Sequence, residues 1–333
     1  MPIETTSGYL VVIGASAGGV QALLQLAEAL PPGFPAPVCI VQHVGANPSL
    51  LPELLANRGP HPAVHARDRQ LLTPGVLHVA PPDHHMLVEG RYLRLTRGPR
   101  ENHTRPAIDP LFRSAALAWG PRAIGVVLSG YMDDGTAGLV AIKDRDGIAV
   151  VQDPATAEEP SMPRSALDAL DVDYSVPLAE LGPLLARLVH QEPAPEPGPA
   201  ADALVREVGI NRGEDLLDNV QAIAQPAGLA CPDCGGGLFE VRDARQLRFR
   251  CHTGHAFSAQ ALERAQAEAG EDAMRGGVRA LQEREILLRR MAAVSEATGD
   301  AGQAEAARRH ADRLHAQVRE LAMLAAAVSG EEP

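Results

Sequence analysis

Short apolar runs alternate with amphipathic stretches along the first part of the chain. The runs Leu10–Ile13, Val38–Val41 and Ile124–Leu128 are rich in β-branched and aliphatic residues, which is typical of strands buried on both faces of a parallel sheet. Stretches with helical periodicity lie between such runs, at Val20–Leu30, Leu111–Trp119 and Gly138–Asp144. The alternation predicts a doubly wound, mostly parallel α/β domain over residues 8–190.

A proline-rich segment ends this alternation. Residues 191–201 carry a proline at every second position from 193 to 199, and proline cannot donate a backbone hydrogen bond to a helix or a sheet, so we expect a linker. Beyond it, the sequence predicts a short helical connector over 202–226, a cysteine-containing module over 227–257 and two alanine-rich helices over 258–328.

The two alanine-rich helices are expected to pair with each other. Small and apolar residues recur in the second helix at alternating spacings of three and four, which forms a heptad seam: Ala304, Ala307, Ala311, Leu314, Val318 and Leu321. The first helix offers compatible positions at Val278, Leu281, Leu288 and Ala292. Because Thr298-Gly299-Asp300 can turn the chain, the pattern favours an antiparallel helical hairpin over the alternative, a coiled coil with a partner.

Composition and charge narrow the class of protein. A formal charge of −12 argues against nucleic acid as a partner, because phosphate binding relies on clustered lysine and arginine. Residues 1–8 lack the pattern of a signal peptide, and no apolar stretch reaches the roughly 18 residues of a membrane span. We therefore expect a cytoplasmic protein that is not embedded in a membrane. Three of the four cysteines cluster at Cys231, Cys234 and Cys251, which fits a metal site in a reducing compartment.

Three loops that follow predicted strands carry the side chains of nucleophilic catalysis. Ser16 lies in a glycine-rich turn after the first run, His43 follows the second, and Asp133 and Asp134 lie in the loop after the third. The carboxyl ends of parallel strands meet at one edge of a sheet, where active sites form. Serine needs a base to take its proton, and histidine needs a carboxylate to fix its tautomer. Spacing alone leaves both aspartates open as the acid.

The glycine-rich turn around Ser16 has other interpretations. A dinucleotide-binding turn would need G-x-G-x-x-G and an acidic residue at the end of the second strand, whereas this chain has Gly14, Gly18 and Gly19 and then Gln42-His43. The segment also fits the G-x-S-x-G turn of α/β-hydrolases, but those enzymes place the acid before the histidine. In a third interpretation, Ser16 only caps the following helix.

Several motifs together resemble the catalytic domain of the bacterial chemotaxis protein-glutamate methylesterases. The resemblance covers about residues 8–190 and rests on segments in the family's order: Ile13–Gly19, Gln42-His43, Ala80–His85, Arg105–Ala116 and Gln152–Ala157. It implies a doubly wound α/β domain that hydrolyses glutamyl methyl esters on methyl-accepting chemotaxis receptors and releases methanol. Members of the family often deamidate receptor glutamines as well.

The resemblance also implies roles for particular residues. The family's nucleophile falls on Ser16, its base on His43 and its acid on Asp134. The backbone amides of Ala17 and Gly18, beside the nucleophile at the head of a predicted helix, are the expected oxyanion donors. No cofactor is expected in catalysis.

The chain departs from the usual family pattern in three places. Ala17 replaces the Thr or Ser that usually follows the nucleophile, and Gly130-Tyr131-Met132 replaces Gly-Met-Gly in the acid loop. We expect Tyr131 to affect substrate fit, and Arg105 either to orient a substrate carboxylate or to pair with Asp109. The best-known members also carry an amino-terminal receiver domain. None is expected here, so we expect ungated basal activity, with control by a partner, the carboxy-terminal module or expression.

The carboxy-terminal module is predicted to bind a structural zinc ion. Cys231 and Cys234 form a two-residue knuckle, and Cys251 with His255 supplies a second ligand pair. His252 is sterically poorer as the fourth ligand because it adjoins Cys251. Two short hairpin strands are expected at Leu238–Val241 and Leu247–Arg250, between the two ligand pairs. This zinc-ribbon-like module, with the helices after it, resembles a tail found on some receiver-less members of the family. Four protein ligands leave no open position for catalysis.

Chemoreceptors are therefore the expected substrate, and the tail is expected to dock a receptor, a cognate methyltransferase or a kinase. Two other functions remain open at this stage. The first is a non-catalytic signalling scaffold on an esterase fold, with the tail as the active part. The second is a general small-ester hydrolase that ignores methylated receptor.

Overall fold

The computed structural model describes residues 8–193, 195, 198–243 and 245–329. Residues 194, 196 and 197 of the predicted linker, and residues 1–7 of the segment that lacks a signal-peptide pattern, lie outside the described residues. The chain divides into two compact units, at residues 1–262 and 263–333. Within the part of the chain that the structure describes, no helix is long and apolar enough to cross a membrane.

The first unit is built on a seven-stranded parallel sheet. Its strands follow the order β3, β4, β2, β1, β7, β8, β9. Their bounds in chain order are Leu10–Ala15 (β1), Val38–Gln42 (β2), Ala63–His65 (β3), Leu77–Val79 (β4), Ala123–Val127 (β7), Ile148–Gln152 (β8) and Tyr174–Val176 (β9). All neighbouring strands run parallel, and Val12 of β1 is aligned with Cys39 of β2 on one side and Gly125 of β7 on the other.

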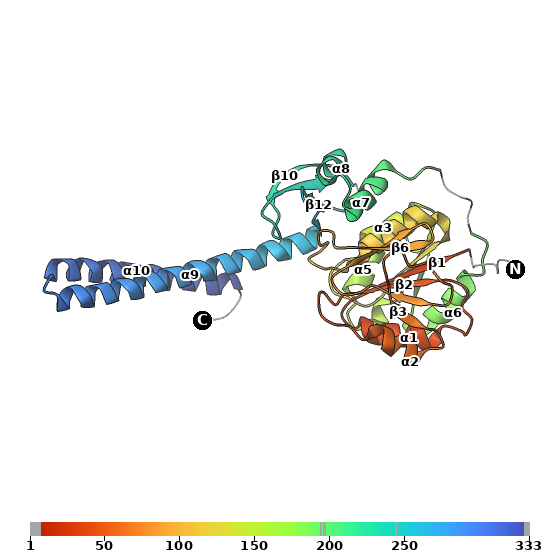
Figure 1. The fold of residues 1–333 in the computed structure, drawn as a ribbon, viewed down its shortest axis with the longest axis horizontal. Helices are drawn as coiled ribbons and strands as arrows, with labels where there is room; N and C mark the ends of the chain where they lie inside the picture. Colours follow the sequence, from red (N-terminus) through yellow and green to blue (C-terminus); the bar gives the residue numbers. More distant parts are fainter. Residues whose placement is uncertain (1–7, 194, 196–197, 244, 330–333) are drawn as a thin grey trace. The chain divides into compact units, whose positions relative to one another are not determined.

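Helices cover both faces of this sheet (Figure 1). One face carries α1 (Gly19–Ala29), α2 (Leu51–Arg58) and α6 (Leu178–Leu188), and the other carries α3 (Ile108–Trp119), α4 (Thr136–Lys143) and α5 (Ser161–Ala169). Side chains of β1 alternate between the two cores with the period of two that a strand imposes: Val11 and Ile13 enter the first, Leu10 and Val12 the second. The predicted doubly wound α/β fold is confirmed.

A β-hairpin extends the second face beyond the sheet. Its strands are β5 (His85–Glu89) and β6 (Tyr92–Thr96), which pair antiparallel. The backbone N–H of Val88 donates to the hydroxyl of Ser114 on α3 at 3.0 Å, so the hairpin is attached to that helix. Two short 3₁₀ turns lie elsewhere in the first unit: Gly120–Arg122 connects α3 to β7, and Pro154–Thr156 lies between β8 and α5.

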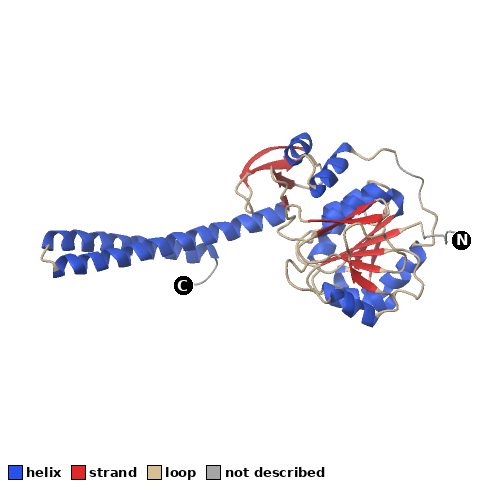
Figure 2. Cartoon of the chain, viewed as in Figure 1, coloured by secondary structure: helices blue, strands red, loops and turns tan. Residues whose placement is uncertain are grey.

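The remainder of the first unit is a small antiparallel sheet with two helices before it (Figure 2). The helices are α7 (Asp202–Arg212) and α8 (Leu216–Ile223). The strands are β10 (Ala224–Ala230), β11 (Gly237–Val241), β12 (Arg248–Cys251) and β13 (Ala256–Ser258), in that order across the sheet. We call this four-stranded sheet the ribbon. Its apolar core is small and includes Leu238, Phe249 and Phe257.

The second unit contains the helical hairpin expected from the heptad pattern. It is formed by α9 (Ala259–Ala297) and α10 (Ala301–Ser329). Five of the predicted seam positions are buried: Ala292, Ala304, Ala311, Leu314 and Val318. Two ion pairs across the hairpin, Arg289 to Asp312 at 3.1 Å and His315 to Glu285 at 3.2 Å, show that the two helices run antiparallel.

Close packing of α1 on α6 generates a stability prediction. A Cβ at Gly182 would lie 2.6 Å from Ala29 Cβ and 2.7 Å from the Ala29 carbonyl oxygen, so Gly182→Ala should lower the free energy of unfolding by about 1–3 kcal/mol. Gly270→Ala is the matched control, because nothing lies within 4 Å of that exposed helical position and alanine should stabilise its helix by up to about 1 kcal/mol. Thermal unfolding of both variants measures the effect, and equal shifts would contradict it.

Candidate active site and metal cluster

Three strands of the large sheet bring a serine, a histidine and an aspartate together. Ser16 follows β1 directly, His43 follows β2 directly, and Asp134 lies in the loop after β7. The Ser16 hydroxyl lies 3.1 Å from Nδ1 of His43, and Nε2 of His43 lies 2.7 Å from Oδ2 of Asp134. With the ring proton on Nε2, Ser16 donates to the histidine and the histidine donates to the carboxylate. The three side chains thus form one continuous hydrogen-bonded chain.

The Asp134 carboxylate is buried and accepts several hydrogen bonds. Besides His43, the backbone N–H groups of Ile108 and Asp109 at the start of α3 donate to it at 2.7 and 3.2 Å, and that of Gly135 donates at 3.0 Å. Burial raises the pKa of Asp134, but the bonds from His43 and α3 outweigh it and hold the pKa below its ordinary value. Asp134 is therefore a buried, ionised group that fixes the orientation of the imidazole.

A second carboxylate, that of Asp109, lies beside Asp134. It accepts from the N–H groups of Gly135 at 3.1 Å and Gly138 at 2.6 Å, which ties the start of α3 to the start of α4. Burial and the charge of Asp134 raise the pKa of Asp109 well above its ordinary value. Of these two neighbouring carboxylates, the low pKa belongs to Asp134, which is the one that contacts the histidine.

The turn that carries Ser16 is held on both sides. Its N–H donates to the carbonyl of Ser129 at 2.9 Å, and its carbonyl accepts from the side-chain amide of Gln42 at 2.8 Å. Gly18 has a φ of 70°, in the left-handed region that glycine adopts without strain, and it caps α1. The hydroxyl of Ser129 donates to the Ala17 carbonyl at 2.7 Å. Ser16 and the two backbone amides after it are therefore held at the head of α1.

The structure separates the two aspartates that spacing left open. Asp134 contacts His43, whereas Asp133 accepts a hydrogen bond at 2.7 Å from the hydroxyl of Ser258 in the ribbon. Met132 in the same loop has a φ of 65°, in the left-handed region that glycine adopts more readily than other residues.

Tyr131 and Arg105 are the two other side chains that were predicted to contact the substrate. Tyr131 is 55% exposed, and a hydrogen bond from its hydroxyl to Glu159 raises its pKa. Arg105 forms a two-pronged ion pair with Asp83, at 2.9 Å from Nε and 2.6 Å from Nη2, and donates to the Gly98 carbonyl. Its partner is Asp83 rather than Asp109. Substrate contact by Tyr131 and Arg105 stays a prediction.

Some residues that support this site were missed at the sequence level. Gln42 and Ser129 fix the turn around Ser16, and Gln152 in turn accepts from the backbone N–H of Ser129 at 3.0 Å. The available signal was their position, since each stands at or just after the end of a parallel strand. Ser258 carried no such signal, because it lies 125 residues from its partner Asp133.

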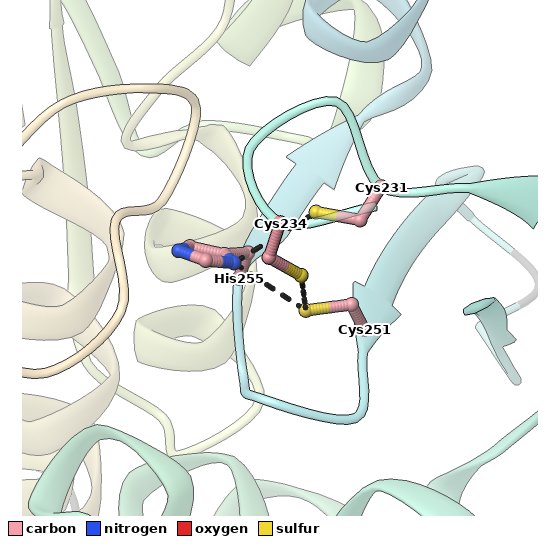
Figure 3. A group of neighbouring side chains, drawn as sticks. All are labelled: Cys231, Cys234, Cys251 and His255. Carbon is pink, nitrogen blue, oxygen red and sulfur yellow. Dashed lines mark hydrogen bonds between the residues drawn. The ribbon is translucent and has the colours of Figure 1, made fainter. Parts of the chain in front are cut away.

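The predicted ligand set of the ribbon comes together in space (Figure 3). The ligand atoms of Cys231, Cys234, Cys251 and His255 all lie within 4.8 Å of one another. Sγ of Cys234 lies 3.7 Å from Sγ of Cys251, and Nδ1 of His255 lies 3.5 Å from Sγ of Cys251 and 3.7 Å from that of Cys231.

These separations fit a tetrahedral metal ion. Bonds of about 2.3 Å to sulfur and about 2.0 Å to nitrogen would separate two sulfurs by roughly 3.8 Å, and a sulfur from a nitrogen by roughly 3.5 Å. Outside the ligand set, the Thr253 hydroxyl lies 3.0 Å from Sγ of Cys251, and Oδ2 of Asp233 lies 3.9 Å from Nε2 of His255. Such neighbours are typical of the outer shell that orients metal ligands. The cluster can hold a metal ion.

The fold and the hydrogen-bonded serine, histidine and aspartate together indicate a hydrolytic class of enzyme. Hydrolytic enzymes use these three side chains on several unrelated scaffolds, and the carboxyl edge of a doubly wound sheet is where active sites form. The model of the CheB methylesterase family matches residues 11–185. The chain therefore belongs to the CheB methylesterase family, a family of hydrolases with a role in chemotaxis.

Individual relatives agree with this assignment. A putative protein-glutamate methylesterase/protein-glutamine glutaminase of Leptospira interrogans is 40% identical over 183 residues, which are 54% of this chain and 93% of that protein. A protein-glutamate methylesterase/protein-glutamine glutaminase of a Nocardioides species is 41% identical over 200 residues, 57% of this chain and 54% of that protein. The crystal structure of the Thermotoga maritima CheB methylesterase catalytic domain superposes with a TM-score of 0.53 at 31% identity, covering 55% of this chain and 99% of that one.

The support of the Ser16 turn can be tested on the reactivity of the serine. Gln42→Leu removes the donor to the Ser16 carbonyl, so the rate at which a fluorophosphonate labels Ser16 should fall by about threefold to tenfold, because small misplacements of reacting groups are costly. Gln70→Leu is the matched control, since that half-buried side chain accepts from the N–H of Arg67 in a different loop. Labelling of the Gln42 variant at the parental rate would contradict the supporting role.

Proposed function

We propose that this protein hydrolyses glutamyl methyl esters on methyl-accepting chemotaxis receptors, with Ser16 as nucleophile, His43 as base and Asp134 as the acid that orients the base. The observation that carries the proposal is the hydrogen-bonded chain from Ser16 through His43 to Asp134 in a member of the CheB methylesterase family. Its relatives support the reaction, since they are named as protein-glutamate methylesterases.

The reaction follows from the positions of these groups. Nδ1 of His43 takes the hydroxyl proton of Ser16 while Oγ bonds to the ester carbonyl carbon, and Asp134 stabilises the resulting imidazolium. The backbone amides of Ala17 and Gly18 donate to the oxyanion. Methanol leaves with the proton from His43, which gives an ester between Ser16 and the receptor glutamate. Water, deprotonated by His43, then cleaves that ester and releases the glutamate carboxylate and free Ser16.

The same groups also hydrolyse the side-chain amide of a receptor glutamine. In that reaction the nitrogen leaves as ammonia after it takes a proton from His43. Because the unprotonated amide ion is a far stronger base and a poorer leaving group than methoxide, proton donation by His43 at the departure step matters more. The product is again a glutamate carboxylate. This second activity rests on the names of the relatives, which pair methylesterase with glutaminase.

We further propose that the metal ion of the ribbon is zinc and that its role is structural. Three cysteines and one histidine favour zinc over harder ions, and four protein ligands leave no open position for a substrate. The ribbon core is also small, and sheets of this size usually need a metal or a disulfide to stay folded. A receptor, a methyltransferase or a kinase remains the predicted partner of the tail.

The decisive experiment measures methanol release from chemoreceptor membranes that carry methyl-labelled glutamates. The parent protein should release methanol, and Ser16→Ala and Asp134→Asn should each lower kcat by roughly 10³-fold or more. Ser175→Ala, an exposed serine on β9, is the matched control and should keep parental activity.

Other outcomes would favour the alternative functions. Hydrolysis of nitrophenyl esters without methanol release from the receptor would indicate a general small-ester hydrolase. A folded protein that releases no methanol and whose Ser16 is not labelled by a fluorophosphonate would indicate a scaffold. Residual activity of Ser16→Ala near the parental level would remove Ser16 from the mechanism.

Metal content and its effect on stability test the structural zinc. Purified protein should contain one zinc ion per chain, and chelation should lower the midpoint of the thermal transition that involves the ribbon. Cys234→Ser should lower the zinc content in the same way, whereas Cys39→Ser should not, because Cys39 is buried in the large sheet away from the cluster. A full complement of zinc in the Cys234 variant would contradict the ligand assignment.

A further inference from the structure

We propose that the ribbon is a positioning element of the hydrolase site, which holds the Asp134 loop and the start of α3, so that turnover depends on the metal-bound fold of the ribbon. The inference rests on the proposed function, because it assigns the ribbon a role in that reaction. It concerns contacts within the first compact unit, residues 1–262.

The first contact joins the end of the ribbon to the acid loop. The Ser258 hydroxyl donates to Oδ1 of Asp133 at 2.7 Å, and Asp133 is the residue directly before the acid. The backbone N–H of Ser258 donates to the side-chain oxygen of Asn102 at 2.9 Å, and the N–H of Asn102 donates to the Ala256 carbonyl at 2.8 Å. The edge of β13 is therefore bonded to the acid loop and to the segment before α3.

The second contact is a cluster of buried charges between the ribbon, α7 and α3. Glu101 lies at its centre and is 1% exposed. Its Oε1 accepts hydrogen bonds from Arg250 of β12 at 3.0 Å and from Asn211 of α7 at 2.5 Å. Its Oε2 accepts a hydrogen bond from Arg113 of α3 at 2.5 Å. Burial raises the pKa of Glu101, but the charges of Arg113 and Arg250 outweigh it and hold the pKa well below its ordinary value.

The charges in this cluster balance. Glu207 of α7 pairs with Arg248 of β12 at 2.9 Å and with Arg113 at 3.1 Å. Arg248 also pairs with Asp243 at 3.2 Å, so three carboxylates face three arginines. Taking away one side of a buried ion pair leaves the other as an uncompensated buried charge. The ribbon therefore cannot separate from α3 without exposing Glu101 and Arg113 to that penalty.

Arg113 connects this cluster to the catalytic aspartate. It lies about one helical turn after Ile108 and Asp109, whose backbone N–H groups donate to the Asp134 carboxylate. Its guanidinium also lies 4.0 Å from Oδ2 of Asp109. A shift of α3 would thus move two of the donors that keep Asp134 ionised and in place. The ribbon reaches Asp134 by two routes, through Asp133 and through α3.

The metal ligands are interleaved with the residues that make these contacts. Arg250 directly precedes Cys251, and its guanidinium donates to the Gly254 carbonyl at 3.2 Å, inside the turn between the ligands Cys251 and His255. Ser258 lies three residues after His255. A metal ion that closes this turn therefore also fixes Arg250 and Ser258, and loss of the ion releases both.

The test compares kcat and KM of zinc-loaded variants on two esters, nitrophenyl acetate and methylated receptor. Ser258→Ala and Asp133→Ala both remove the same hydrogen bond and should each lower kcat on both esters by about fivefold to twentyfold, with KM within about twofold of the parent. Their double variant should be no slower than the slower single variant, because one contact is lost only once. Ser258→Thr keeps the hydroxyl and should restore kcat.

Two controls separate positioning from general destabilisation. The Ser258 hydroxyl also accepts from the N–H of Ala261, but Asp133→Ala leaves that helix cap in place. Arg245→Gln removes another ribbon contact, the exposed ion pair of Arg245 with Asp144 at 2.5 Å, and should keep the parental kcat because Asp144 lies at the far end of α4.

Chelated enzyme should lose at least about tenfold in kcat on nitrophenyl acetate and regain it with added zinc.

The outcomes are distinguishable from a failure of the proposed function. Parental kcat in Ser258→Ala and Asp133→Ala on both esters would overturn the inference alone. A rise of KM for the receptor only, with nitrophenyl acetate unaffected, would also overturn it and would indicate that the ribbon docks the receptor. A parent protein inactive on both esters would overturn the proposed function, and this inference with it.

Discussion

The arrangement of the candidate active site depends on keeping one carboxylate ionised inside the protein. Asp134 is 2% exposed, and burial by itself would favour its neutral form. Its charge is compensated by donors from three directions: His43 from the edge of the sheet, the start of α3, and Gly135 at the start of α4. Parallel strands supply this arrangement, because their carboxyl ends meet where the following helices begin and present free N–H groups. The hydrogen-bonded chain to Ser16 exists only while those donors stay in place.

The ribbon also makes contacts in which buried charges are compensated by neighbouring groups. Its apolar core is small, and it is supplemented by ion pairs that are largely buried and by a Cys/His cluster that can hold a metal ion. Removing one partner of a buried ion pair leaves an uncompensated charge, so the two sides of this contact depend on each other. Glu101 receives donors from α3, α7 and β12 together, and no apolar side chain could join three elements in this way. A module that looks independent in the sequence is therefore joined to the neighbours of Asp134.

Much of the fold could be read from local pattern. The apolar runs that became β1, β2 and β7 and the heptad seam of the hairpin were both correctly predicted, because burial on two faces and burial along one stripe leave different periods in the sequence. The metal cluster was predicted from ligand spacing for the same reason, since a tight turn allows few spacings. The partner of Arg105 was not predictable: Asp83 lies 22 residues away on another loop, and any nearby acid, including Asp109, was equally plausible from the sequence.

The sequence by itself determined the strand and helix periods, the residue types needed for a serine hydrolase, and the four candidate ligands, because each depends on neighbours within one turn or one knuckle. Only the tertiary structure decided which aspartate faces His43, that Met132 adopts a left-handed conformation, and that Ser258 and Arg250 bond to Asp133 and Glu101. These outcomes join residues up to 149 positions apart. Their energies come from burial and charge compensation, which arise only when distant segments pack together and leave no periodic signal along the chain.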